Sequence, residues 1–153
     1  MRFYSVALIT LLAACGGSQP EAKAPPPPAP APTAYKDMNL DQRKEFMEKV
    51  VLPEMKTTFA AFEPKFADMN CKSCHGKGAE DGSFEMPSAE LPVLPNTPEK
   101  FAEYAKDPEH ARWSKFMVEE VEPKMANLLQ LKPFDPATKT GEFSCMACHT
   151  TEK

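Results

Sequence analysis

The sequence predicts a mostly α-helical domain that is built from two copies of one unit. Two stretches carry apolar residues at helical spacing, and we find no period that indicates a sheet. Ten residues from Phe46 match ten residues from Phe116 at five positions, which include one proline and two methionines. A Cys-x-x-Cys-His motif follows each stretch. We therefore expect two helix–loop–motif repeats, at about residues 40–76 and 108–150, in one domain of residues 36–153.

The N-terminal residues are typical of an export signal. Arg2 precedes a short apolar stretch that cannot span a bilayer. The stretch ends in Leu-Ala-Ala-Cys, which resembles the lipobox of bacterial lipoproteins. We expect residues 1–14 to be removed and Cys15 to become a lipidated N-terminus, the alternative being an ordinary signal peptide with an incidental cysteine. Gly16 is not an aspartate, which by the enteric sorting rule favours a periplasm-facing anchor in the outer membrane of the cell envelope.

Residues 15–35 predict a tether between this anchor and the domain. Residues 16–35 contain seven prolines and five alanines with only two charged side chains, so they cannot build a core. At about 3.1 Å per residue such a segment reaches roughly 60 Å. A disordered leader without a spacing role is the alternative.

The first long helix is expected over about residues 40–62. Asn39 and Gln42 match a capping box at its start. Pro53 should kink the helix, because proline lacks a backbone N–H and clashes with the preceding turn. One apolar stripe follows the helix and consists of Met47, Val51, Met55, Phe59 and Phe62.

The second long helix is expected over about residues 108–131. Asp107 and Pro108 match an N-cap followed by proline, and Thr97 and Pro98 predict a shorter helix in the same way. The stripe of the long helix consists of Trp113, Met117, Val121, Met125, Leu128 and Leu129, and Pro123 repeats the position of the first proline. A Gly- and Pro-rich loop of residues 76–97 separates the two halves.

The two cysteine motifs have the spacing of c-type haem attachment sites. Two thiols three positions apart can each add to one vinyl group of the porphyrin, and the adjacent histidine binds the iron. The chain has five cysteines and three histidines, and the motifs use all of them except Cys15 and His110. We therefore expect two covalently bound haem c groups. Their attachment residues are Cys71, Cys74, Cys145 and Cys148, and their proximal iron ligands are His75 and His149.

Zinc and disulfides are the alternative uses of these cysteines. The two cysteine pairs of a zinc ribbon lie about 15–20 residues apart, whereas 70 residues separate Cys74 from Cys145. Disulfides suit an exported protein, but they leave both trailing histidines unexplained.

The second haem must take its sixth ligand from upstream, because only four residues follow His149. The repeat offers Met125 for this haem and Met55, at the equivalent position, for the first haem. Both methionines lie on the expected helices, 20 and 16 residues before their motifs. An ordinary core role is the alternative for each.

This order of methionine helix, turn and motif resembles the haem-binding repeats of the cytochrome subunit of photosynthetic reaction centres. The resemblance covers about residues 40–76 and 110–150 and implies that Met55 and Met125 are distal ligands. That subunit has four haems, and neither the Pro-x-Met sequence nor the loop of residues 76–97 belongs to its pattern.

Other side chains compete for the distal positions or pack near them. Met86 lies 11 residues after His75 and precedes a proline, which resembles the Met-Pro pair of class I cytochromes and makes it the rival of Met55 for the first haem. His110 could bind either iron, although the third position of a helix favours a solvated side chain. Packing roles are expected for Met47 and Met117 in the core and for Met69 against the porphyrin.

An iron that binds histidine at one axial position and methionine at the other has no open position for a substrate. We therefore expect a membrane-anchored electron carrier, not an enzyme, with donor and acceptor cytochromes, an oxidase or a reaction-centre-type complex as partners. The net charge of −4 favours no nucleic-acid partner. The alternatives are a peroxidase-type enzyme with one open haem and a haem-based sensor.

Overall fold

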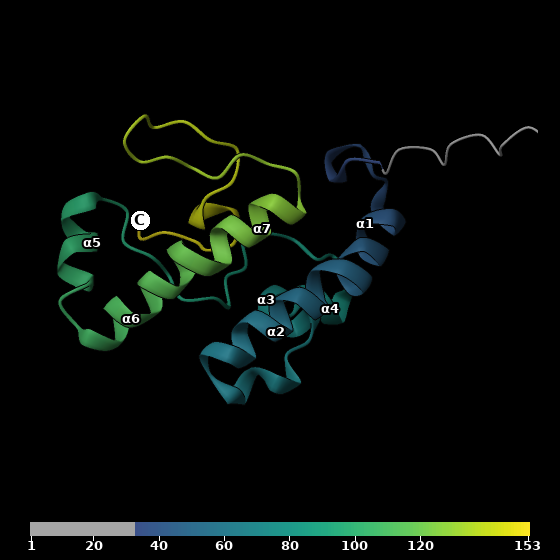
Figure 1. Ribbon diagram of the computed structural model, residues 1–153, viewed down its shortest axis with the longest axis horizontal. Coiled ribbons are helices and arrows are strands. Elements are labelled where there is room, and N and C mark those ends of the chain that lie inside the picture. The colour runs from purple at the N-terminus through teal and green to yellow at the C-terminus, as the bar shows by residue number, and fades with distance from the viewer. Residues whose placement is uncertain (1–32) are drawn as a thin grey trace, which may run out of the picture. The chain divides into compact units, whose positions relative to one another are not determined.

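A computed structural model describes residues 33–153, which are mostly helical (Figure 1). Within this range there is no named strand, and the extended segments meet only at isolated bridges. The expected mostly α class is therefore confirmed. The expected signal peptide, Cys15 and most of the tether lie outside the described residues.

The first long helix runs without a break as α1 (Leu40–Phe46), the π-helical turn η2 (Met47–Val51) and α2 (Leu52–Phe62). Its predicted capping box is present, since the Gln42 amide donates to Asn39 Oδ1 at 3.0 Å and the Asn39 amide donates to Gln42 Oε1 at 2.9 Å. These two bonds satisfy backbone groups that have no partner within the helix. The expected range of residues 40–62 is therefore confirmed.

The second long helix has the same three parts, α6 (Pro108–Phe116), the π-helical turn η4 (Met117–Val121) and α7 (Glu122–Leu128). The predicted cap is present, because Asp107 Oδ1 accepts the amides of Glu109 and His110. The helix ends at Leu128, earlier than the expected residue 131. Gln130 takes a left-handed φ of 58°, which breaks the helical path.

A π-helical turn lies directly before each helix proline. The amide of Leu52 donates to the Met47 carbonyl, and the amide of Glu122 donates to the Met117 carbonyl, each five residues back. Pro53 and Pro123 have no amide to give, and a wider turn relieves the contact between the ring and the preceding carbonyl. The same π-helical turn therefore accompanies the proline at equivalent positions of both repeats.

The two long helices pack against each other in a reciprocal way. Helix α2 contacts the turn η4, and helix α7 contacts the turn η2. Val51 and Val121, at equivalent positions in the two turns, are both buried in the same apolar cluster. Aromatic rings extend this cluster, and Phe62 stacks on Phe116 with ring centroids 3.9 Å apart. The buried members of this first cluster are Val51, Met55, Met69, Phe116 and Val121.

A second apolar cluster involves the end of α7 and has Ala126, Leu129 and Phe143 as its buried members. The half-buried side chains of Phe46, Met47 and Met125 pack against both clusters. Tyr35 also packs here, with its ring 5.7 Å from that of Phe46. The ordered structure therefore includes a residue that the sequence assigns to the tether.

The remaining elements are short; one precedes the first long helix, four lie between the two long helices and one follows the second. The predicted helix at Thr97 and Pro98 is present, whereas the loop of residues 76–97 contains one helical turn that the sequence does not predict. These elements are η1 (Tyr35–Asp37), η3 (Pro64–Asp68), α3 (Cys71–His75), α4 (Gly78–Asp81), α5 (Pro98–Tyr104) and η5 (Cys145–Ala147).

Candidate functional site

The first cysteine motif forms the short helix α3. Asn70 caps it, because Asn70 Oδ1 accepts the Lys72 amide at 3.0 Å and the Asn70 amide donates to Ser73 Oγ at 3.1 Å. Within one helical turn, residues three positions apart lie on the same face. This geometry brings the thiols of Cys71 and Cys74 to one side of the turn, as joint attachment to one porphyrin requires.

His75 ends this helix and is half-buried. Its Nδ1 atom is shielded from solvent and has no hydrogen-bond partner within residues 33–153. Burial lowers the pKa of His75, and an interaction with the backbone of Phe84 opposes this shift. The Phe84 ring also meets the imidazole edge-on, with 5.4 Å between centroids. Burial therefore favours the neutral form of the ring, which is the form that binds a metal.

The second motif forms a 3₁₀ turn, η5, in place of an α-helical turn. Ser144 caps it by accepting the Met146 amide at 3.3 Å, and the His149 amide donates to the Cys145 carbonyl at 2.9 Å. The His149 Nδ1 atom lies 2.9 Å from the Pro92 carbonyl oxygen. A carbonyl can only accept, so Nδ1 carries the proton and Nε2 keeps its lone pair free for a ligand.

The four motif cysteines are free and half-buried. Burial raises the pKa of Cys74 to about 11, and the charge on Cys71 adds to the shift. Burial likewise raises the pKa of Cys148 to about 11, with further contributions from Cys74 and Cys145. The disulfide alternative is not formed in this structure.

Each candidate distal methionine packs in the same apolar cluster as a cysteine of its own repeat. Met55 is buried in the first cluster, against which Cys74 also packs. Met125 packs against the second cluster together with Cys148. Met125 also contacts the first cluster, so the two candidate sites share part of their apolar surroundings.

The competing ligands have different surroundings. Met86 is half-buried and belongs to neither cluster. His110 is exposed, as expected, and its ring stacks on that of Tyr104 with centroids 3.8 Å apart. The three methionines with expected packing roles, Met47, Met69 and Met117, all contact the first cluster.

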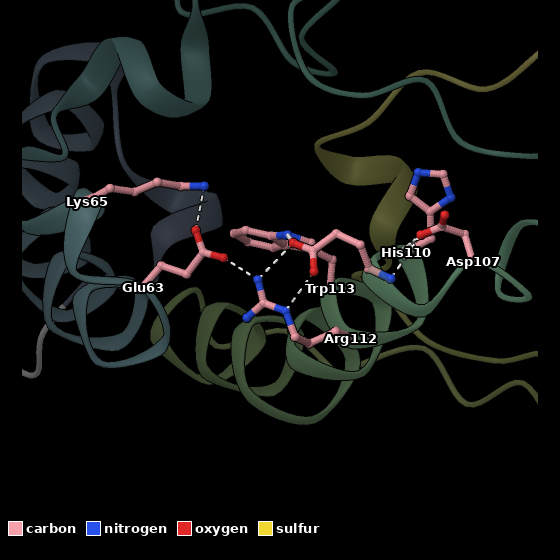
Figure 2. Close-up of polar contacts among 7 residues, drawn as sticks. Glu63, Lys65, Asp107, His110, Arg112 and Trp113 are labelled. Carbon is pink, nitrogen blue, oxygen red and sulfur yellow. Dashed lines mark hydrogen bonds and ion pairs between the residues drawn. The ribbon is translucent and has the colours of Figure 1, made fainter.

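A polar network that the sequence does not predict joins the two halves at the ends of the long helices (Figure 2). Arg112 forms ion pairs with Glu63, which follows α2, and with Glu109 at 2.8 Å. Its guanidinium also lies over the Phe62 ring, 4.3 Å from the centroid. Hydrogen bonds from Arg112 lower the pKa of Glu109 to about 2, and Trp113 Nε1 adds a bond of 2.9 Å.

No three His, Cys, Asp or Glu side chains of residues 33–153 converge as a metal site of such groups requires. No helix of the same residues is long and apolar enough to cross a membrane.

No family model, no curated protein and no solved structure matches this chain. Function must therefore be argued from the residues of the two motifs and their surroundings.

The residues of both motifs suit covalent haem. The four thiols form no disulfide, and they occur as two pairs in the sequence. The His149 imidazole is oriented with its Nε2 free, and a methionine packs with the apolar cluster beside each motif. Apolar surroundings of this kind suit a porphyrin, which has two large apolar faces.

Proposed function

We propose that this protein is a dihaem c-type cytochrome that transfers single electrons at the bacterial cell envelope. The observation that carries the proposal is the pair of Cys-x-x-Cys-His motifs, each of which packs beside an apolar cluster that contains a methionine. Chance pairing of four cysteines with two adjacent histidines is a poor explanation for this arrangement.

Each haem would be held by the residues of one repeat. In the first repeat Cys71 and Cys74 would attach the haem, and His75 and Met55 would bind its iron. In the second repeat the same roles fall to Cys145, Cys148, His149 and Met125. A bound haem supplies reversible one-electron exchange between ferrous and ferric iron.

The protein residues orient these ligands and exclude water. The Pro92 carbonyl accepts the Nδ1 proton of His149, which fixes the ring and makes Nε2 a better donor. The apolar side chains of both clusters keep water from the iron ligands, and exclusion of water favours an iron that changes charge with little rearrangement.

Two irons with both axial positions filled would suit an electron carrier rather than an enzyme or a sensor. Donor and acceptor partners are then other redox proteins, such as cytochromes, an oxidase or a reaction-centre-type complex. Acylation of Cys15 would hold the carrier at the membrane, facing the periplasm, with the outer membrane favoured.

The decisive experiment is a haem-to-protein ratio measured on the purified protein, followed by reduction under carbon monoxide. We expect two haems that stay attached after denaturation and a reduced spectrum that carbon monoxide leaves unchanged. A chain with no covalent haem refutes the cytochrome proposal. A spectrum that changes with carbon monoxide at one haem favours the alternative, a peroxidase-type enzyme with one open iron.

A further inference from the structure

One segment, residues 88–94, binds the second motif and the residues that follow it. The Ser88 amide donates to the Cys148 carbonyl at 3.0 Å, and the Pro92 carbonyl faces His149 Nδ1 at 2.9 Å. Leu94 continues the pairing, because its amide donates to the Thr150 carbonyl at 2.9 Å. We call residues 88–94 the bracket.

The bracket also reaches the first motif through Glu90. Glu90 Oε1 accepts the Lys77 amide at 3.0 Å, two residues after His75. Its carboxylate lies against Gly76, where a Cβ atom would stand 2.6 Å from the Glu90 Cδ atom. Gly76 has a φ of 54° and lacks a side chain, so the backbone directly after the first motif is open to the carboxylate.

We propose that Glu90 is a positioning residue and that the bracket holds the two motifs as one unit. The proposal rests on the proposed function only in assigning a haem to each motif. A hydrogen bond to an ionised carboxylate is stronger than one between neutral groups. Glu90 therefore anchors the bracket to the first motif, and backbone hydrogen bonds anchor it to the second.

A side-chain substitution at Glu90 removes the bond between the bracket and the first motif. The bonds to the second motif use backbone amides and carbonyls, which most substitutions leave in place. Glu90 is exposed, so its replacement leaves no cavity. Its carboxylate also places a negative charge beside the backbone of the first motif, and negative charge stabilises ferric iron over ferrous iron.

The test compares Glu90→Ala with Glu90→Gln in the full-length protein. Glu90→Ala removes both the charge and the acceptor, whereas Glu90→Gln keeps an oxygen that can accept the Lys77 amide. Hydrogen exchange is measured at the amides of Lys77 and Glu152, the latter being bound to the Leu94 carbonyl at 3.0 Å. We expect exchange at both amides to rise about tenfold in Glu90→Ala, and to stay within about twofold of wild type in Glu90→Gln.

The midpoint potentials of the two haems supply a readout that a purely structural role would not move. Cys71→Ser weakens attachment of the first haem and Cys148→Ser that of the second, so these two variants show which midpoint potential belongs to which haem. We expect the first haem's potential to rise in both Glu90 variants and the second haem's potential to shift only in Glu90→Ala. The control is Glu80→Gln, since Glu80 pairs with Lys72 of the first motif and lies outside the bracket in the sequence.

The outcomes separate this inference from the cytochrome proposal. Exchange that rises at Lys77 but not at Glu152, or a second haem that ignores Glu90→Ala, overturns the linkage. Equal shifts in Glu80→Gln and Glu90→Gln overturn the special role of Glu90. A protein without haem fails the cytochrome proposal, while its exchange pattern still decides whether the bracket links the motifs.

Discussion

Val51 and Val121 stand 70 positions apart in the sequence and are buried in one apolar cluster, each in the π-helical turn of its own long helix. The turn that contains one valine packs on the helix that follows the other. This reciprocal contact means that each repeat completes the apolar core of the other. One repeat alone would expose the stripe that its partner covers.

We expect Val51→Ala and Val121→Ala to destabilise the protein by similar amounts, about 1–3 kcal/mol each. Both substitutions remove two methyl groups from the same cluster, and the two side chains are buried to a similar extent. Urea denaturation of the holoprotein measures the effect. Val118→Ala is the matched control, because Val118 is 58% exposed and should change stability by less than about 0.5 kcal/mol. A large effect at Val118 and none at Val121 would contradict the described helix contact.

We expect Met55→Ala and Met125→Ala each to remove one Met–iron charge-transfer band and to lower one haem potential. Loss of the thioether ligand destabilises ferrous iron relative to ferric iron. Absorption spectroscopy and redox titration read the two effects. Met86→Ala is the control for the first haem, since Met86 lies outside both clusters. If Met86→Ala removes the band and Met55→Ala keeps it, the two repeats bind haem differently.

We expect Cys15→Ser to release the protein from the membrane fraction. The reason is the lipobox-like sequence that ends at Cys15 and the tether that follows it. Detergent partitioning and cell fractionation compare the variant with wild type. Equal partitioning of the two proteins into detergent would show that Cys15 carries no lipid.

We expect the network around Arg112 to make stability fall as the pH drops from about 5 towards 2. Hydrogen bonds from Arg112 hold the pKa of Glu109 at about 2, and bonds from Lys65 and Arg112 lower the pKa of Glu63. A folded-state pKa below the unfolded value stabilises the fold above the unfolded pKa, and this contribution disappears as the pH falls through the folded pKa.

The melting temperature as a function of pH measures this effect. Arg112→Gln should make the acid limb less steep, because the pKa of Glu109 then moves back towards its ordinary value, whereas the bond from Lys65 still lowers the pKa of Glu63. Lys106→Gln is the control, since it breaks the exposed pair with Glu103, a carboxylate outside this network. An acid limb that stays unchanged in Arg112→Gln would assign the acid sensitivity to other groups.

Local signals explain why the long helices could be predicted. The caps at Asn39 and Asp107 and the apolar stripes depend on residues close in sequence, and all of them are present. The early end at Leu128 could not be predicted, because Gln130 takes a left-handed conformation without the glycine that usually marks one.

The bracket and the Arg112 network could not be predicted for a different reason. Pro92 meets His149 through a backbone carbonyl, which every residue has, so no residue type marks the contact. Arg112 lies on α6 and Glu63 follows α2, so their pairing depends on how the two long helices pack. The glycine directly after the first motif was the one available sign that another group approaches the backbone there.

A π-helical turn contains one residue more than the α-helical turn it replaces. Removing a single residue from Met47–Val51 would therefore restore ordinary spacing and leave the flanking faces aligned, whereas a deletion elsewhere rotates everything beyond it by about 100°. The same holds for Met117–Val121. Distant copies of this unit should accordingly be sought among helices that are one residue shorter and lack the proline, a length difference that ordinary pattern matching would count against them.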